Sequence, residues 1–127
     1  MNHPSETVAV LDFETTGLSP VRGDRPTEIA IALVRAGEVV DRYQSLMNAG
    51  VRIPSNIVSY TGIANEMVGA APPISKVMRE AALFVGQLPL VAHNASFDCR
   101  FWQAELEALS IHSANPFACT LLLARRI

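Results

Sequence analysis

The sequence predicts an α/β domain built on a mixed sheet, and three observations support this fold class. The first half of the chain holds three runs rich in Val and Ile that short links join. The second half alternates segments of helical periodicity with short apolar runs. Half of the 127 residues are hydrophobic and only 17% are charged, which suits a chain that buries one core and excludes a disordered tail.

The first half of the chain predicts three neighbouring strands. A turn with Gly23 and Asp24 follows the first run, and a tight three-residue link, 36–38, separates the second run from the third. Strands joined by links this short pair in antiparallel fashion. The three predicted strands are residues 7–12, 28–35 and 39–47.

The second half predicts helix, strand, helix and strand in turn. Residues 70–73 and 86–89, both with Pro, bound a helix whose apolar residues recur at helical spacing: Ile74, Val77, Met78, Ala81 and Val85. Strands separated by such crossover helices run parallel. The further predicted elements are a strand over 90–92, a helix over 96–109, a short strand at 117–118, and a last helix capped by Thr120 and cut off by the end of the chain.

Two carboxylates stand at the end of the first predicted strand. Asp12 and Glu14 follow the apolar residues 8–11, and residues two apart on a strand point to the same side. Paired carboxylates with substrate phosphate oxygens are a usual site for Mg²⁺ or Mn²⁺. The motif therefore favours metal-assisted phosphate chemistry, although an Asp at a strand end can also simply begin a turn.

A second motif follows the predicted strand 90–92. Ser96 occupies the position of a helix N-cap, and Asp98 falls in the first helical turn, where the helix dipole favours negative charge. Taken alone, Asp98 is therefore explained by helix stability. The combination of this motif with the earlier one is far more specific than either half.

Residues 12–17 read Asp-Phe-Glu-Thr-Thr-Gly and residues 93–98 read His-Asn-Ala-Ser-Phe-Asp. These stretches match in full the first two motifs of the DEDD (DnaQ-like) family of 3′-5′ exonucleases, and the chain most resembles the proofreading ε subunits of bacterial DNA polymerase III. Residues 60–68 resemble the family's Gly-Ile loop, and residues 120–125 resemble its Thr-Leu-x-x-Ala-Arg stretch. The resemblance covers nearly all of residues 8–126.

This resemblance implies a ribonuclease H-like fold, with a mixed five-stranded sheet flanked by helices and the first motif on the central strand. It implies two divalent ions, Mg²⁺ or Mn²⁺, held by Asp12, Glu14 and Asp98, which are also the expected catalytic residues. Asp12 would bridge both ions and Glu14 would hold the ion on the nucleophile side. The substrate-binding residues that it implies are Thr15, Thr16, Gly17, Leu18, Ile63, Asn94 and Phe97.

The family's third motif, a His with an acidic residue about five positions later, lies beyond the stretch that resembles residues 120–125, and the sequence ends at Ile127. We therefore expect a polar leader over residues 1–6 and a C-terminally truncated exonuclease domain over 7–127. No residue is assigned as general base. His3 and His112 read as solvated, and His93 reads as a positioning residue of the second motif.

Three functions stay open at the level of sequence. The first is proofreading-type hydrolysis of single-stranded or frayed DNA 3′ ends, and the second is the same chemistry on RNA ends. The third is a non-catalytic module that binds nucleic acid or a DNA polymerase catalytic subunit. A net charge of −2 and a pI near 5.9 argue against coating of nucleic acid by bulk charge. Arg22 and Arg25, after the first motif, are the candidate substrate-contacting cations.

The two cysteines, Cys99 and Cys119, form no metal-binding or redox pattern and read as small core residues, although a disulfide between them stays open. No signal peptide is evident, and no apolar run approaches the roughly 20 residues that a membrane helix needs. The sequence therefore predicts a cytoplasmic, reduced protein without a membrane span.

Overall fold

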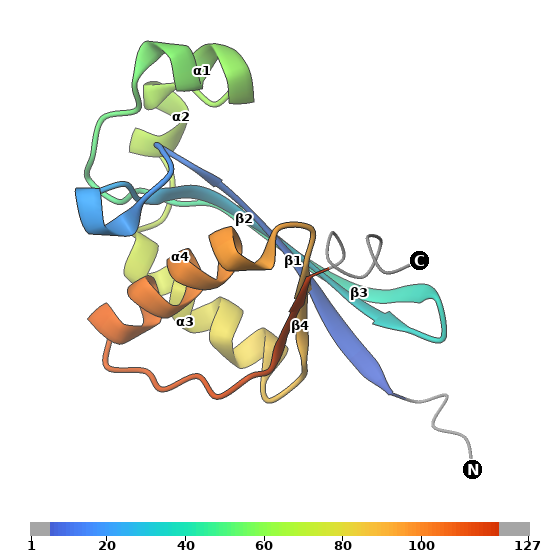
Figure 1. The fold of residues 1–127 in the computed structure, drawn as a ribbon. Helices are drawn as coiled ribbons and strands as arrows, with labels where there is room; N and C mark the ends of the chain where they lie inside the picture. Colours follow the sequence, from blue (N-terminus) through green and yellow to red (C-terminus); the bar gives the residue numbers. More distant parts are fainter. Residues whose placement is uncertain (1–5, 120–127) are drawn as a thin grey trace.

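The computed structural model describes residues 6–119 and contains a five-stranded mixed sheet with the strand order β3-β2-β1-β4-β5 (Figure 1). The pairs β1–β2 and β2–β3 are antiparallel, whereas β1–β4 and β4–β5 are parallel, as the sequence predicts. The strand that carries the first motif is central. The strands are β1 (Thr7–Thr15), β2 (Pro26–Arg35), β3 (Glu38–Leu46), β4 (Leu90–Ala92) and β5 (Phe117–Cys119).

Two longer helices pack on the sheet and two shorter ones lie at one end of it (Figure 1). The longer helices are α3 (Ile74–Val85) and α4 (Ala95–Ala108). The short helices α1 (Ser55–Thr61) and α2 (Asn65–Gly69) enclose a small apolar cluster of their own. A single 3₁₀ turn, η1 (Pro20–Arg22), follows the first motif.

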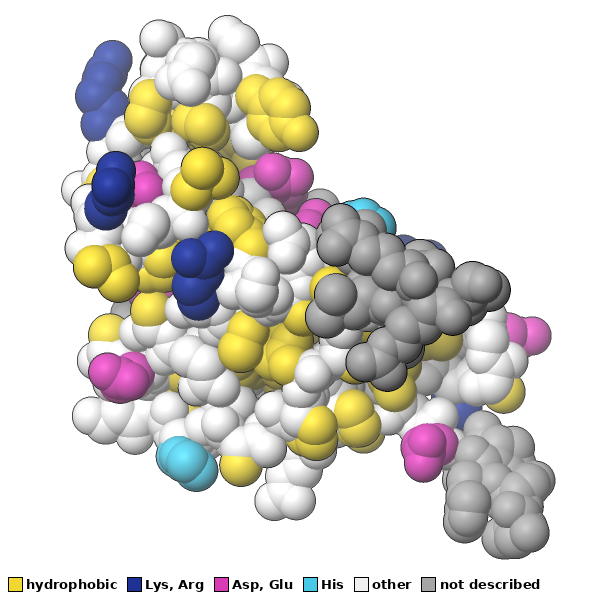
Figure 2. Space-filling model, viewed as in Figure 1, with side chains coloured by type: hydrophobic (Ala, Val, Ile, Leu, Met, Phe, Trp, Pro, Cys, Tyr) yellow, Lys and Arg dark blue, Asp and Glu magenta, His cyan; other side chains and the backbone are white. Residues whose placement is uncertain are grey.

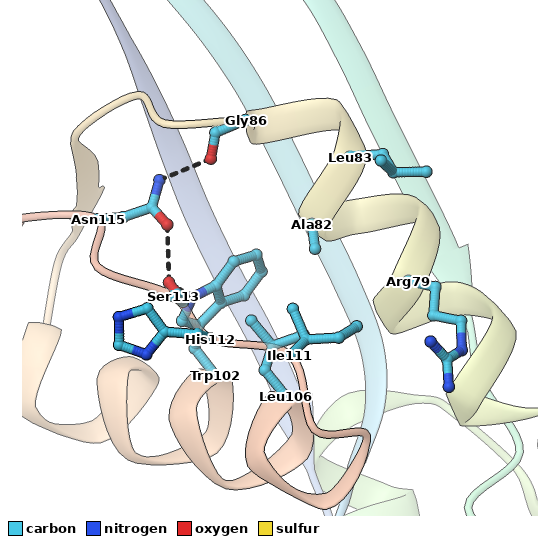
Figure 3. A pocket seen from close by; sticks show the side chains of 10 residues that line it. All are labelled: Arg79, Ala82, Leu83, Gly86, Trp102, Leu106, Ile111, His112, Ser113 and Asn115. Atoms are coloured by element: carbon cyan, nitrogen blue, oxygen red, sulfur yellow. Dashed lines mark hydrogen bonds between the residues drawn. The ribbon is translucent and has the colours of Figure 1, made fainter.

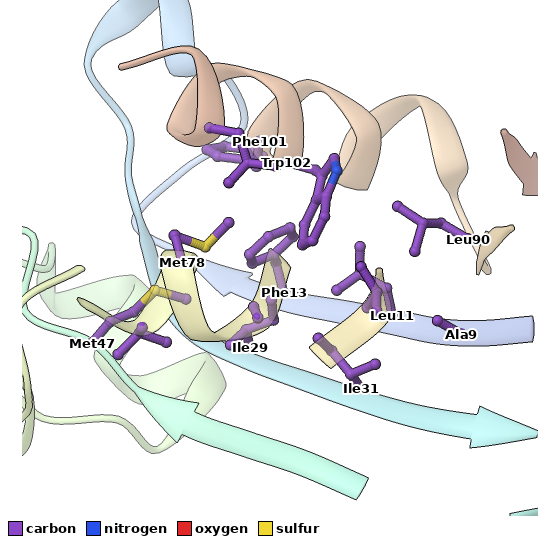
Figure 4. Packing of buried hydrophobic residues seen from close by; sticks show 14 residues of the cluster. Ala9, Leu11, Phe13, Ile29, Ile31, Met47, Met78, Leu90, Phe101 and Trp102 are labelled. Atoms are coloured by element: carbon purple, nitrogen blue, oxygen red, sulfur yellow. The ribbon is translucent and has the colours of Figure 1, made fainter. Parts of the chain in front are cut away.

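The core lies between one face of the sheet and the helices α3 and α4 (Figure 4). From Ala9 to Phe13 every second residue of β1 is buried there, with Leu11 and Phe13 packing near Met78 of α3 and Trp102 of α4. Because side chains alternate along a strand, the residues between them must point to the opposite face. The burial of Leu11 and Phe13 thus fixes the direction of the carboxylates at positions 12 and 14.

Strand β1 is longer than predicted, since it continues to Thr15 and not only to Asp12. The antiparallel pairing with β2 continues through Glu14 and Glu28, and the register shifts only after that pair. The carboxylates of the first motif therefore project from a paired strand, where the ladder holds their backbone.

The helices α1 and α2 were not predicted from the sequence. Pro54 precedes α1, and Gly62 ends it at a φ of +76°, a left-handed conformation that glycine adopts without strain. Pro and Gly are also common in loops, so both residues suggest a loop in the sequence.

The predicted cap of α4 was wrong. The helix begins at Ala95, and the Ser96 hydroxyl donates to Asn94 Oδ1 from inside the first turn.

The remaining predictions concern residues at the margins of the described range. The predicted cap at Thr120 and the family-like stretch 120–125 lie outside the described residues, as do residues 1–5 of the predicted leader. Cys99 and Cys119 form no disulfide with each other and are only partly buried, so neither is the core residue that was predicted. Within residues 6–119 no helix is long and apolar enough to cross a membrane.

Candidate active site

Asp12 and Glu14 project from the face of β1 that α3 and α4 leave uncovered. Glu14 pairs across the strands with Glu28 of β2, so three carboxylates share this patch of the sheet. The Glu28 carboxylate accepts a hydrogen bond from Gln44 Nε2 at 2.9 Å. Sequence reasoning missed Glu28, because only the strand register places it beside the first motif.

The three carboxylates repel one another. Burial raises the pKa of Asp12 above its ordinary value, and the charge of Glu28 raises it further. Burial likewise raises the pKa of Glu14, with added repulsion from Asp12 and Glu28. Crowded carboxylates that resist ionisation are relieved by a cation, which makes this patch of the sheet a candidate cation site.

Asp98 reaches the same region from the first turn of α4. The Phe13 backbone N–H donates to Asp98 Oδ1 at 3.2 Å, which joins the two motifs across 85 positions of the chain. Burial raises the pKa of Asp98 to about 6, against the lowering effect of the Phe13 hydrogen bond, and the charges of Asp12 and Glu14 raise it further. The helical crossover after β4 therefore brings the third predicted carboxylate to the first two.

The donor set suits a hard divalent cation. Within residues 6–119 no group of three or more His, Cys, Asp and Glu side chains converges closely enough to hold a metal ion on its own. Mg²⁺ does not require such a group, because it commonly binds one or two carboxylates, several waters and substrate phosphates. Carboxylate oxygens on an accessible strand face fit that mode of binding.

A pocket of about 250 Å³ adjoins this patch through Glu14, which forms part of its wall, whereas Asp12 and Asp98 are not among its lining residues. Its other walls come from the end of β1, the following loop, α1 and α4, and are mostly apolar. Four predicted substrate-binding residues line it. The complete lining is Phe13, Glu14, Thr15, Gly17, Leu18, Ile57, Tyr60, Thr61 and Phe97.

Three predicted substrate-binding residues lie elsewhere. Ile63 is only 6% exposed and packs with Ile53 and Val68 in the cluster beneath α1 and α2. Thr16 is buried behind the loop, and Asn94 is exposed at the start of α4. The α1 residues of the pocket were not predicted as site residues, although Tyr60 and Thr61 belong to the family-like stretch that could have indicated them.

The loop after the first motif is tied together by Asp24. Its carboxylate accepts hydrogen bonds from the Thr16 hydroxyl and from the Ser19 backbone N–H, both at 3.1 Å. Gly17 is enclosed by this arrangement, because a Cβ atom there would stand 2.5 Å from the Asp24 carboxylate oxygens. The absence of a side chain at Gly17 therefore allows the Asp24 carboxylate to approach the backbone there and to accept its two hydrogen bonds.

Arg25 is engaged in an ion pair within the protein, and its predicted contact with substrate stays a prediction. Its Nε and Nη2 atoms donate to the two carboxylate oxygens of Glu105 at 2.7 and 2.8 Å. Arg22 lies exposed on η1 and stays a prediction. Figure 2 shows the basic side chains of the displayed face standing apart from one another, without a continuous basic patch.

A second cavity, of about 390 Å³, lies between α3, α4 and the loop 110–116 (Figure 3). Apolar side chains dominate its lining, which contains no Asp or Glu. Trp102 Nε1–H donates to Ser113 Oγ, and Ser113 donates to Asn115 Oδ1, so its polar groups bond one another. This cavity lacks the chemistry of the smaller pocket beside Glu14.

Comparison with known proteins identifies relatives for nearly the whole chain. The family described as "Exonuclease" (RNase T) matches residues 9–127. The PolC-type DNA polymerase III of Oceanobacillus iheyensis is 39% identical over 121 residues, and that of Bacillus subtilis is 39% identical over 122 residues. Each match covers 94% of this chain and 8% of the relative, so the chain spans about a twelfth of these polymerases.

Solved structures share the fold. A complex of ExoI with SSB-Ct superposes with a TM-score of 0.84 at 17% identity, covering 96% of this chain and 30% of that one. Exonuclease X in complex with 5′ overhanging duplex DNA superposes with a TM-score of 0.73 at 29% identity, covering 94% and 63%. The layout of the sheet and its helices is therefore that of known exonucleases, as the predicted ribonuclease H-like fold requires.

Proposed function

Because the chain belongs to the exonuclease family, we propose that it is a 3′-5′ exonuclease domain that shortens single-stranded or frayed DNA from the 3′ end. One observation carries the proposal. The carboxylates of Asp12 and Glu14 stand on an accessible strand face, Glu14 lines a largely apolar pocket of about 250 Å³, and Asp98 is hydrogen-bonded to the same strand. A charged phosphodiester and an apolar base have adjacent places there.

In the proposed reaction the protein holds the metal ions and orients the carboxylates that bind them. Asp12, Glu14 and Asp98 would hold two divalent ions, Mg²⁺ or Mn²⁺, and such ions supply activation of water and stabilisation of the leaving oxygen. The paired backbone of β1 fixes the first two carboxylates, and the Phe13 N–H orients the third. Orientation by a rigid strand suits a reaction that depends on in-line geometry.

The pocket is suited to the terminal nucleotide without selecting its base. Phe97, Leu18 and Ile57 offer apolar and aromatic surface, against which any base can stack. The Thr15 hydroxyl is already used in a 2.6 Å hydrogen bond to Gly17 O. Stacking on apolar and aromatic side chains favours an enzyme that does not select the base of the terminal nucleotide, as removal of mismatched ends requires.

The relatives support a role in replication. They are PolC-type DNA polymerases III, and we propose that the chain, as a domain over residues 7–127, edits the growing 3′ end beside a polymerase catalytic subunit. RNA ends are the alternative substrate, and the 2′-hydroxyl is the group by which a protein can distinguish them from DNA ends. A matched RNA substrate therefore belongs in the test.

The test is digestion of 5′-labelled single-stranded DNA with Mn²⁺, compared between the wild type and Asp12→Ala. We expect a ladder that shortens from the 3′ end, abolished by chelator and slowed about 10³-fold or more in Asp12→Ala, because electrostatic groups at the reacting centre commonly contribute at this scale. Asp41→Ala, on the exposed part of β3, removes a carboxylate far from the pocket and should leave the ladder unchanged. Absence of a wild-type ladder would refute the proposal.

Calorimetry tests the cation site separately from catalysis. Mn²⁺ should bind to the wild type and to Asp41→Ala, and binding should be much weaker in Asp12→Ala, because the variant lacks one of the three carboxylates that would hold the ions. Unchanged Mn²⁺ binding by Asp12→Ala would contradict the assignment of Asp12 as a ligand, whatever the digestion shows.

A further inference from the structure

Arg25 and Glu105 form a two-pronged ion pair between the loop after β1 and helix α4. The guanidinium donates two hydrogen bonds to the carboxylate, from Nε and Nη2, at 2.7 and 2.8 Å. Glu105 is only 5% exposed, and a buried carboxylate is costly unless it is paired. Because Glu105 is buried, this ion pair is not one of the solvent-exposed charge pairs that keep a protein soluble, and it needs a structural or functional explanation.

On the helix side, the pair shares its face with Asp98. Glu105 follows Asp98 by seven residues, or two helical turns, so both side chains leave α4 in the same direction. Asp98 accepts from the Phe13 backbone, whereas Glu105 accepts from Arg25. The helix is thus fastened at two separate points to the chain segment that begins with the first motif.

On the loop side, Arg25 is coupled to the pocket through Thr16. The Thr16 N–H donates to Arg25 O at 2.9 Å, and the Arg25 N–H donates to Thr16 Oγ1 at 3.1 Å. Thr16 directly precedes Gly17 and Leu18, which line the pocket. A shift of Arg25 is therefore transmitted to one wall of the pocket, while Phe97 of α4 forms another.

We infer that Arg25 and Glu105 are positioning residues that set the separation of the loop wall and the helix wall of the nucleotide pocket. The inference rests on the proposed function for its kinetic consequence. The pair acts on substrate binding more than on the chemical step, because Asp98 is held independently by Phe13. Loss of binding that is equal in the ground and transition states raises KM and leaves kcat unchanged.

The kinetic test replaces both charges at once, by Arg25→Met with Glu105→Leu. Apolar replacement of a buried pair commonly preserves folding, whereas removal of one partner leaves an unpaired buried charge. We expect KM for a single-stranded oligonucleotide to rise at least fivefold with kcat within twofold of wild type. An unchanged KM would overturn the inference and leave the pair a purely structural one.

Two further variants complete the kinetic test. Arg25→Lys keeps the charge but loses the fork, so its KM should lie between those of the wild type and the double variant. It carries the test alone if the double variant fails to fold, and a wild-type KM would then overturn the inference. The matched control is Lys76→Gln with Glu80→Gln, which removes the exposed ion pair of α3 at 3.2 Å and should leave both constants unchanged.

Amide hydrogen exchange provides a readout that needs no activity. In the double variant the Thr16 and Ser19 amides should exchange at least tenfold faster, since their acceptors belong to the loop that Arg25 fixes. The Phe13 amide, bonded to Asp98, should keep its protection. A parallel loss at all three amides would indicate global destabilisation and overturn the inference. An inactive wild type would refute the proposed function and leave this comparison valid.

Discussion

The carboxyl group of Asp98 lies between strand β1 and the first turn of α4, in surroundings that oppose its ionisation. Burial is the main cause, and it raises the pKa of Asp98 from 3.8 to about 6 despite a hydrogen bond from Phe13. In the native protein without metal, the proton is therefore held more tightly than in the unfolded chain. This difference contributes stability below about pH 4, which is lost as the pH rises through about 6.

Asp98→Asn should raise the stability of the metal-free protein at pH 7.5 by at most about 2–3 kcal/mol, the equivalent of two pKa units. The amide oxygen can still accept from the Phe13 N–H, so the change removes the charge and keeps the contact. Thermal unfolding in chelator at pH 7.5 and pH 5 is the measurement, and the difference between variant and wild type should shrink at pH 5.

Asp41→Asn, on exposed β3, serves as the control and should change neither melting temperature appreciably. A less stable Asp98→Asn at pH 7.5 would show that the raised pKa of Asp98 has been assigned the wrong sign. If the assignment is right, added Mn²⁺ should stabilise the wild type more than Asp98→Asn, because the variant lacks one anionic oxygen ligand.

Among single residues, the sequence predicted the carboxylates whose position follows from neighbouring residues on one strand. It missed the carboxylate whose position depends on how two strands pair. Asp12 and Glu14 are two apart on one strand, so their common direction follows from strand geometry alone. The approach of Asp98 rested on resemblance. Glu28 stands opposite Glu14 because of the antiparallel pairing, which one sequence does not specify to the residue.

Among the elements, the loop between β1 and β2 depends most on a single small residue. A Cβ atom added at Gly17 would stand 2.5 Å from the carboxylate oxygens of Asp24. That carboxylate cannot rotate away freely, because it accepts hydrogen bonds from Thr16 and Ser19. The loop wall of the pocket is consequently intolerant of even one methyl group.

Gly17→Ala should cost about 1–3 kcal/mol of stability, the usual cost of forcing extra volume into a packed site, and should raise KM for the oligonucleotide by displacing Leu18. The control is Gly69→Ala at the end of α2, where a Cβ has open space and should be neutral or slightly stabilising. Denaturant unfolding and steady-state kinetics measure both variants. Equal stability and KM for Gly17→Ala and wild type would mean that Asp24 moves aside without cost.

The elements that the sequence predicted well are those with a clear period, such as α3 with its recurring apolar face. Helix α1 escaped prediction because its seven residues are too few to show a period and are bounded by Pro54 and Gly62, which also mark loops. Strand β1 was predicted too short because polar residues after Leu11 resemble a turn. Their extended conformation comes from pairing with β2, a contact between segments distant in sequence.

For the whole molecule, the two faces of the sheet have divided roles. One face carries the core beneath α3 and α4, and the other presents Asp12, Glu14 and Glu28. The net charge is −2, and the basic side chains visible in Figure 2 stand apart from one another. We therefore expect a strand end to be held by the pocket and by cations at the carboxylates, since the displayed face offers no continuous basic patch to attract it.

The affinity for single-stranded DNA should accordingly depend weakly on salt. If the protein neutralises only two or three phosphates, the logarithm of the association constant should fall with the logarithm of salt concentration at a slope of about −1.4 to −2.1. Fluorescence anisotropy of Asp12→Ala with a labelled oligonucleotide, titrated from low to high salt, measures this slope without cleavage. A slope steeper than about −4 would require roughly six phosphate contacts and would contradict this expectation.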